Sequence, residues 1–177
     1  YIEEYKDVNL DYEIPDIKLT PNNLENKNSD NKNSSKKNAK PKRSKESKKI
    51  GVLGENYVQK YEYNKLCKLN KKDLAEKIEM HCHNNEYPGY DITSFDDKGN
   101  KIFIEVKSTK GKSINAFVMT DNEWQAAEKE GNNYFIYLVN NIGKGEPKIL
   151  GQICDPATKW KNKKLIREVA SYDIKIS

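Results

Sequence analysis

The sequence predicts an α/β fold over residues 50–177, in which helices flank a mixed central β-sheet. Apolar residues between 51 and 69 recur at spacings of three and four, the period of a helix with one buried face. Runs of β-branched and aromatic residues follow, each bounded by turn residues. A second helical pattern, from 120 to 131, lies between two of these runs. The order of helix, strands, helix and strand is typical of a mixed sheet flanked by helices.

The first half of this domain supplies the first helix and a hairpin. The helix is expected from Gly51 to Leu69, and a short helical turn and a strand at 77–81 follow it. GYDITSFD (89–96) and KIFIEVKST (101–109) then form two strands. Because the intervening DKGN is a turn sequence in which Gly supplies a permissive backbone, these two strands are expected to pair.

The second half begins with a capped helix. Thr120 or Asp121 is the expected N-cap, with Glu123 in the first turn and Gly131 at the end. Further strands are expected at 115–120 (NAFVMT), 133–141 and 147–153. The alternatives for residues 157–177 are a basic loop, a short helix or a final edge strand.

The basic charge of the chain lies mainly outside this domain. The net charge is +5, but residues 32–49 alone carry nine Lys and Arg against one Glu, while residues 1–31 carry three Lys against eight acidic residues. Residues 21–49, rich in Asn, Lys and Ser, are expected to be a disordered linker. Residues 1–20 have alternating apolar positions, and are expected to be the end of an upstream region or a docking segment. The charge by itself is therefore a weak argument for nucleic-acid binding.

Several classes of protein are disfavoured. No apolar run approaches 18 residues, and the N-terminus lacks a signal-peptide pattern, so neither a membrane span nor secretion is expected. Cys67, Cys82 and Cys154 are too few and too far apart for a disulfide framework, which fits a reducing cytoplasm. The HCH sequence at 81–83 lacks the second ligand pair of a structural zinc site, and neither Gly-Lys turn is a P-loop.

A carboxylate and a lysine interrupt the apolar strand at 101–109. Alternation places Glu105 and Lys107 on one face of the strand and Val106 on the other. The hairpin brings Asp91 close to Glu105, and two neighbouring carboxylates repel unless a cation lies between them. Hard oxygen ligands suit Mg²⁺ or Mn²⁺, and a lysine beside the ion orients a water or stabilises developing phosphate charge. The alternative is a salt bridge on a solvated sheet face.

The same residues resemble the core of PD-(D/E)XK nucleases, in which an acidic residue precedes a strand of the form Glu-x-Lys. More narrowly, the segments GVLGENYVQKYE, GYDITSFD, FIEVKST and MTDNEW together resemble the NO VEIN C-terminal-like domain, itself considered PD-(D/E)XK-like. The resemblance covers roughly residues 50–140 and implies a restriction-endonuclease-like core. Pro88 departs from the pattern, since it lies three residues before Asp91 rather than directly before it.

The resemblance implies an Mg²⁺-dependent endonuclease, with Mn²⁺ possible as the cofactor and with DNA as the expected substrate, RNA being left open. The implied metal ligands are Asp91, Glu105, the Val106 carbonyl and Glu55. Lys107 would position or activate the attacking water. Supporting roles are assigned to Asn122 and Glu123, and contacts with nucleic acid to Tyr90, Lys110 and Lys112.

The resemblance also implies that the domain works together with other domains or subunits. Such domains often end long bacterial proteins, so upstream domains or partner subunits such as a helicase or ATPase are expected, in a restriction or anti-phage role. Two alternatives remain open. One is a catalytically inactive module of the same fold that binds nucleic acid or a partner protein, and the other is an interaction domain whose carboxylates lie on a solvated face.

Overall fold

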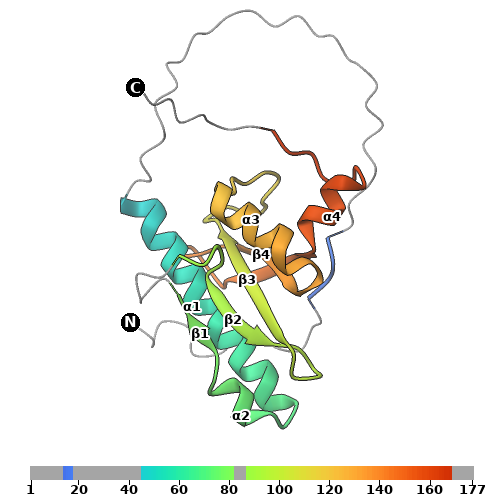
Figure 1. The fold of residues 1–177 in the computed structure, drawn as a ribbon. Helices are drawn as coiled ribbons and strands as arrows, with labels where there is room; N and C mark the ends of the chain where they lie inside the picture. The colour runs from blue at the N-terminus through green and yellow to red at the C-terminus, as the bar shows by residue number, and fades with distance from the viewer. Residues whose placement is uncertain (1–13, 18–44, 82–86, 169–177) are drawn as a thin grey trace, which may run out of the picture.

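The protein, seen in a computed structural model that describes residues 14–17, 45–81 and 87–168, is built around one mixed sheet with the strand order β1-β2-β3-β4-β5 (Figure 1). The elements are α1 (Lys45–Lys68), α2 (Lys72–Ala75), β1 (Glu79–Met80), β2 (Ile92–Phe95), β3 (Lys101–Ser108), α3 (Asp121–Glu130), η1 (Gly131–Asn133), β4 (Tyr134–Asn140), β5 (Lys148–Cys154) and α4 (Pro156–Lys161). The predicted fold class, α/β with a mixed sheet flanked by helices, is confirmed.

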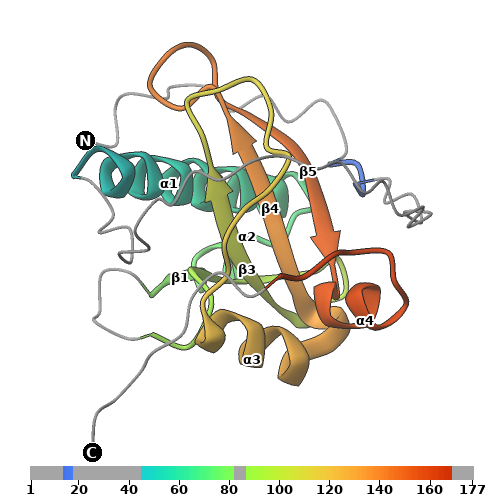
Figure 2. The ribbon, with the colours of Figure 1, turned by 90° about the horizontal axis from the view of Figure 1, so that it is seen from above.

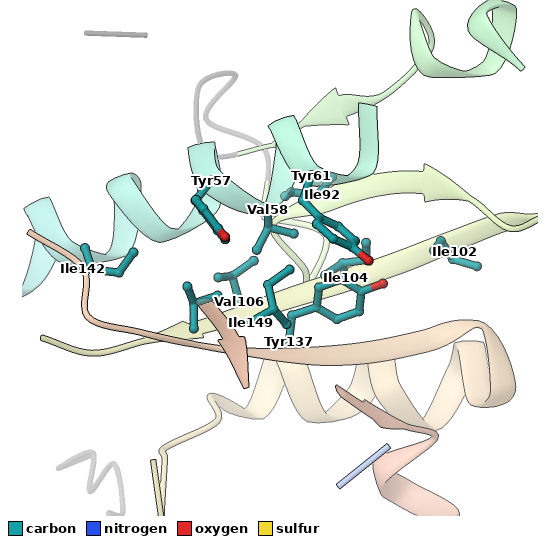
Figure 3. Packing of buried hydrophobic residues seen from close by; sticks show 11 residues of the cluster. Tyr57, Val58, Tyr61, Ile92, Ile102, Ile104, Val106, Tyr137, Ile142 and Ile149 are labelled. Atoms are coloured by element: carbon teal, nitrogen blue, oxygen red, sulfur yellow. The ribbon is translucent and has the colours of Figure 1, made fainter. Parts of the chain in front are cut away.

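Helices cover both faces of the sheet. The long helix α1 lies on one face, and α3 and α4 lie on the other (Figure 2). Figure 3 shows Tyr57, Val58 and Tyr61 of α1 pointing toward the sheet. They pack on apolar side chains of the strands and of the β4–β5 loop, namely Ile92, Ile102, Ile104, Val106, Tyr137, Val139, Ile142 and Ile149. The opposite core is formed by Ala126, Ala127, Tyr134, Ile136, Leu138 and Ile153.

The predicted hairpin is present. β2 and β3 are antiparallel, with Ile92 opposite Ile104. At the turn, the Asp96 carboxylate accepts hydrogen bonds from the backbone N–H groups of Lys98 and Asn100, at 2.9 and 2.8 Å. β3 is parallel to β4, and α3 forms the crossover between them. β5 then pairs with β4 in the antiparallel sense.

The predicted strand at 115–120 is wrong. β3 already has β2 on one side and β4 on the other, so the segment that follows it finds no free edge beside it. Residues 115–120 instead lead to α3 without strand pairing. Phe117 and Met119 pack against the core on the α3 side, while Val118 is 62% exposed. The apolar run at 116–119 therefore belongs to a loop that lies along the core.

The boundaries differ at both ends of the domain. α1 begins at Lys45, six residues before the expected start, so the last five residues of the predicted linker are helical. These residues are exposed, and their composition is as suitable for a solvated helical turn as for a linker. Residues 21–44 of that linker lie outside the described residues. Of the alternatives for 157–177, the short helix is confirmed by α4 as far as Lys161, while 169–177 lie outside the described residues.

Three further expectations concern membrane spans, the cysteines and the HCH sequence. In the described ranges, no helix has both the length and the apolarity needed to cross a membrane. Cys67 and Cys154 are free thiols, whereas Cys82 and His83 of the HCH sequence lie outside the described residues. His81 is buried, and its Nε2 shares a hydrogen bond with Thr93 Oγ1 at 2.8 Å.

A buried carboxylate ties α1 to the sheet. Glu62 is 0% exposed, and it accepts hydrogen bonds from Ser94 Oγ of β2 at 2.7 Å and Tyr137 Oη of β4 at 3.0 Å. The Lys65 ammonium, one helical turn later, forms an ion pair with the same carboxylate. Because each of these groups is buried or partly buried with a partner, the network fixes the rotation of α1 about its axis.

We expect Glu62→Ala to lower the free energy of unfolding by about 3–5 kcal/mol, because it leaves two hydroxyls and one ammonium without their acceptor. Urea denaturation is the measurement. The matched control is Glu76→Ala, whose carboxylate forms an exposed ion pair with Lys72 and should cost less than about 1 kcal/mol. Equal losses in the two variants would contradict a stabilising role for the network.

Candidate active site

Glu105 and Lys107 lie on the face of β3 that α3 covers, while the side chain of Val106 packs under α1, as alternation predicts. Lys107 Nζ is 2.6 Å from Glu105 Oε1 and 2.8 Å from Glu123 Oε2. Glu105 is only 4% exposed and Lys107 only 8%. The alternative of a salt bridge on a solvated face is therefore wrong: the ion pairs exist, but they are buried.

The N-terminus of α3 supplies the second carboxylate for Lys107. Thr120 Oγ1 accepts a hydrogen bond from the Glu123 N–H at 3.2 Å, and Glu123 Oε2 accepts one from the Thr120 N–H at 3.0 Å, which is a capping box. The Glu123 carboxylate thus closes the start of the helix and also holds Lys107, while its supporting role in the site stays a prediction. Asn122 contributes differently, since its Nδ2 donates to the Tyr87 carbonyl at 2.6 Å.

Asp91 stands one residue before β2, in the position opposite Glu105. Its backbone N–H donates to the Ile104 carbonyl at 3.0 Å, and its Oδ2 accepts from the Val106 N–H at 2.8 Å. Burial, and then the negative charge of Glu55, raise the pKa of Asp91 to about 6. Asp91 is therefore held at the end of the hairpin by β3 itself, in surroundings that oppose its ionisation.

The loop before Asp91 is fastened to α3 and β4. Gly89 has a φ of 94°, and a Cβ there would lie 2.5 Å from the Asn122 carbonyl oxygen and 2.7 Å from Ala126 Cβ. Only glycine fits such a conformation and such a close approach. Tyr134 Oη, from a side chain that is 0% exposed, donates to the Gly89 carbonyl at 2.9 Å. These contacts determine the path of the backbone as it reaches Asp91.

Glu55 comes to the site from α1. A Cβ on Gly54 would lie 2.6 Å from Ser108 Cβ, so the glycine allows α1 to approach the end of β3 closely. Glu55 Oε2 is buried and has no hydrogen-bond partner among the described residues. After burial, the negative charge of Glu55 is the next cause of the raised pKa of Asp91. A buried carboxylate oxygen without a partner is costly, and a cation would relieve that cost.

Negative charge exceeds positive charge in this cluster. Burial, followed by the charge of Asp91, raises the pKa of Glu105 well above its usual range. Burial lowers the pKa of Lys107, but the charges of Glu105 and Glu123 outweigh it, so the net shift is upward. Lys107 is the one ammonium that these interactions include, and it faces several carboxylates. The cluster is therefore short of positive charge.

The carboxylates of this cluster are oxygen donors, but they do not form an assembled metal site. Among residues 14–17, 45–81 and 87–168, no group of three or more His, Cys, Asp or Glu side chains is arranged so that it could hold a metal ion. The Lys107 ammonium, which pairs with both Glu105 and Glu123, already occupies the space between those two carboxylates. Asp91, Glu105 and the unpartnered oxygen of Glu55 nevertheless present oxygen ligands with uncompensated charge, which is the chemistry that Mg²⁺ and Mn²⁺ prefer.

The residues predicted to contact nucleic acid lie in different surroundings. Lys110 forms an ion pair with Glu46, and Lys112 is exposed. Tyr90 is partly buried, with its ring 4.7 Å from that of Phe103 and 5.2 Å from that of His81. Tyr90 thus packs against the sheet, which leaves Lys112 as the most accessible of the three.

Sequence reasoning missed the residues that position Asp91 and Glu55. Gly54 and Gly89 were visible in GENYV and GYD, but a glycine in a sequence does not show what approaches it. Nothing in the sequence around Tyr134 indicated its contact with Gly89, because the Tyr134 hydroxyl reaches Gly89 only once β4 lies beside β3.

The raised pKa of Asp91 makes stability depend on pH. The folded protein binds the proton of the Asp91 carboxyl more tightly than the unfolded chain does. The resulting contribution to the free energy of unfolding is therefore fully present below about pH 4 and is lost as the pH rises through about 6. Without divalent cations, we expect this group to lower the free energy of unfolding by about 3 kcal/mol between these limits. Urea denaturation at several pH values, in EDTA, should show a flatter profile for Asp91→Asn. Parallel profiles for the two proteins would be evidence against the buried, repelled carboxylate.

Comparison with known proteins agrees with the family indicated by the sequence. No curated protein and no solved structure matches the chain. The family model described as "Protein NO VEIN, C-terminal" matches residues 54–153, which include Glu55, Asp91, Glu105 and Lys107. The match spans more than half of the chain and runs from the middle of α1 to β5, and the chain therefore belongs to the NO VEIN C-terminal family.

Proposed function

We propose that this domain is a metal-dependent endonuclease of the PD-(D/E)XK type that hydrolyses phosphodiester bonds in DNA. The observation that carries the proposal is the pairing of Asp91 with Glu105 across the hairpin, with Lys107 beside them and negative charge left uncompensated. Buried carboxylates with raised pKa values are expensive to keep, and such groups concentrate at functional sites.

Asp91 and Glu105 are the proposed metal ligands, with Glu55 and the Val106 carbonyl completing the set. A divalent cation bound there supplies Lewis-acid polarisation of the phosphate and a bound water of lowered pKa. Asp91 is oriented for this role by the Val106 N–H, which occupies only its Oδ2. Glu55 brings an oxygen that no other described group satisfies.

Lys107 positions the nucleophile. Because the charges of Glu105 and Glu123 raise its pKa, it is protonated at neutral pH and donates hydrogen bonds rather than accepting a proton. Its ammonium can orient the attacking water and stabilise the charge that develops on the phosphate. In the hydrolysis, the attacking water would give up a proton to solvent and its oxygen would form a bond to phosphorus, while the bond from phosphorus to the leaving oxygen would break and that oxygen would take a proton from solvent.

The wider setting is also proposed. The domain acts in the cytoplasm, joined to upstream domains or to partner subunits such as a helicase or ATPase, in a restriction or anti-phage role. Lys112, which is exposed, and Lys110 beyond the end of β3 would contact the DNA backbone. The support for this setting is the family membership and the charge of the segments near β3.

The first test is cleavage by the full chain. We expect Mg²⁺-dependent cleavage of plasmid DNA, and a loss of at least ~100-fold in Glu105→Gln and Lys107→Gln, because each removes one electrostatic contribution to the transition state. Glu128→Gln, an exposed position on α3, is the matched control and should cleave like the wild type. Thermal melting of each variant checks that the fold is retained. Unaltered cleavage by both site variants would overturn the proposal.

A second function is favoured by one observation. Lys107 is held by two carboxylates, and no three-ligand group is preformed in the described ranges, which suits a nuclease-fold module that binds nucleic acid or a partner protein without catalysis. Calorimetric titration with Mg²⁺ distinguishes the two functions. Metal binding that is lost in Asp91→Asn, together with cleavage products, supports the nuclease. Salt-sensitive DNA binding without metal or products supports the inactive module.

A further inference from the structure

A short segment far from the domain in sequence pairs with the outer edge of the sheet. The N–H of Ile17 donates to the Gln152 carbonyl at 3.0 Å, and the N–H of Gln152 donates to the Pro15 carbonyl at 3.0 Å. Asp16 and Gln152 form a parallel bridge. β5 is the last strand in the order, so residues 14–17 extend the sheet beyond it.

Apolar side chains of residues 14–17 pack on both faces of the sheet edge. Ile14 packs against the core under α1, and Ile17 packs against the core under α3. Pro15 and Asp16, between them, are exposed. Pro15 contributes a carbonyl to the pairing, and its lack of an N–H costs nothing, since proline suits the edge of a sheet. The contact is therefore an extended peptide with apolar side chains at positions i and i+3.

Gly151 makes the edge able to receive this peptide. A Cβ at this position would lie 2.5 Å from Ile17 Cδ1 and 2.8 Å from the Pro15 carbonyl oxygen. The three nearest atoms to that Cβ all belong to the docked segment, and none belongs to the domain. The absence of a side chain at 151 thus makes room for the peptide alone.

We propose that the β5 edge is a peptide-binding groove for extended apolar segments, and that residues 14–17 of the same chain are its ligand and keep it closed to other peptides. The mode is β-strand addition, in which main-chain hydrogen bonds supply affinity and the alternate side chains supply specificity. This inference is independent of the proposed nuclease activity, because β5 is separated from β3 by β4.

The ligand is assigned to the same chain by mass action. The 27 residues from 18 to 44 can span at most ~90 Å, ample for a return to the domain. Because the segment is covalently connected to the domain, its effective concentration at the β5 edge is roughly millimolar. At lower protein concentrations, it therefore outcompetes residues 14–17 of a second copy for that edge. An unpaired edge of β5 would otherwise be open to pairing between molecules.

Hydrogen exchange of the full chain tests the pairing. We expect the amides of Ile17 and Gln152 to be protected in the wild type and to exchange at least ~10-fold faster in Gly151→Ala, with the amide of Ile136 in β4 unchanged. Gly145→Ala is the matched control, because no atom lies within 4 Å of a Cβ there and protection should persist. Unchanged protection in Gly151→Ala, or equal loss in both variants, would overturn the proposed groove.

Peptide binding tests the ligand. A fluorescent peptide of residues 8–20 should bind the 177-residue chain carrying Ile17→Asp at least ~10-fold more tightly than the wild type, whose groove is occupied. The double variant that adds Gly151→Ala should not bind it. No binding to Ile17→Asp at millimolar peptide would overturn the groove. Protection of Ile17 that rises with protein concentration, with dimers in sedimentation, would show a second copy as the ligand and overturn the assignment to the same chain.

Discussion

Strand β3 imposes the constraint on which the rest of this structure depends. It has a strand on each side and a helix on each face, so five of its eight residues are buried and two more are partly buried. Two of those side chains, Glu105 and Lys107, carry charge, and burial of charge is unfavourable unless it is compensated. The protein compensates by pairing them with one another and with Glu123, whose place at the start of α3 is set by a capping box.

The compensation is incomplete, and this links the fold to the proposed chemistry. Asp91 and Glu55 add further negative charge, and burial followed by the charge of Glu55 raises the pKa of Asp91 although Lys107 opposes that rise. Close backbone approaches at Gly54 and Gly89 hold both groups where they repel each other. A protein that needed only stability would gain by replacing them with apolar residues.

Much of the fold and part of the site were predictable, because both depend on local patterns. The turn at 97–100 determined the pairing of β2 with β3 and hence the register of Asp91 with Glu105. Strand alternation placed Val106 on one face and Lys107 on the other. Where prediction failed, the deciding contact was distant: the apolar run at 116–119 belongs to a loop that lies along the core.

The sequence by itself determined the two main helices, the hairpin register and the placement of Asp91, Glu105 and Lys107, since each follows from periodicities and turns within a few residues, whereas Glu55 was indicated by the family resemblance. Tertiary structure alone decided that the charges are buried, that Glu123 joins Lys107, and that Gly89 and Tyr134 position Asp91. It also decided that residues 14–17 close the edge of β5. These are contacts between distant segments, and a local pattern cannot specify them, because burial and pairing depend on what the rest of the chain brings alongside.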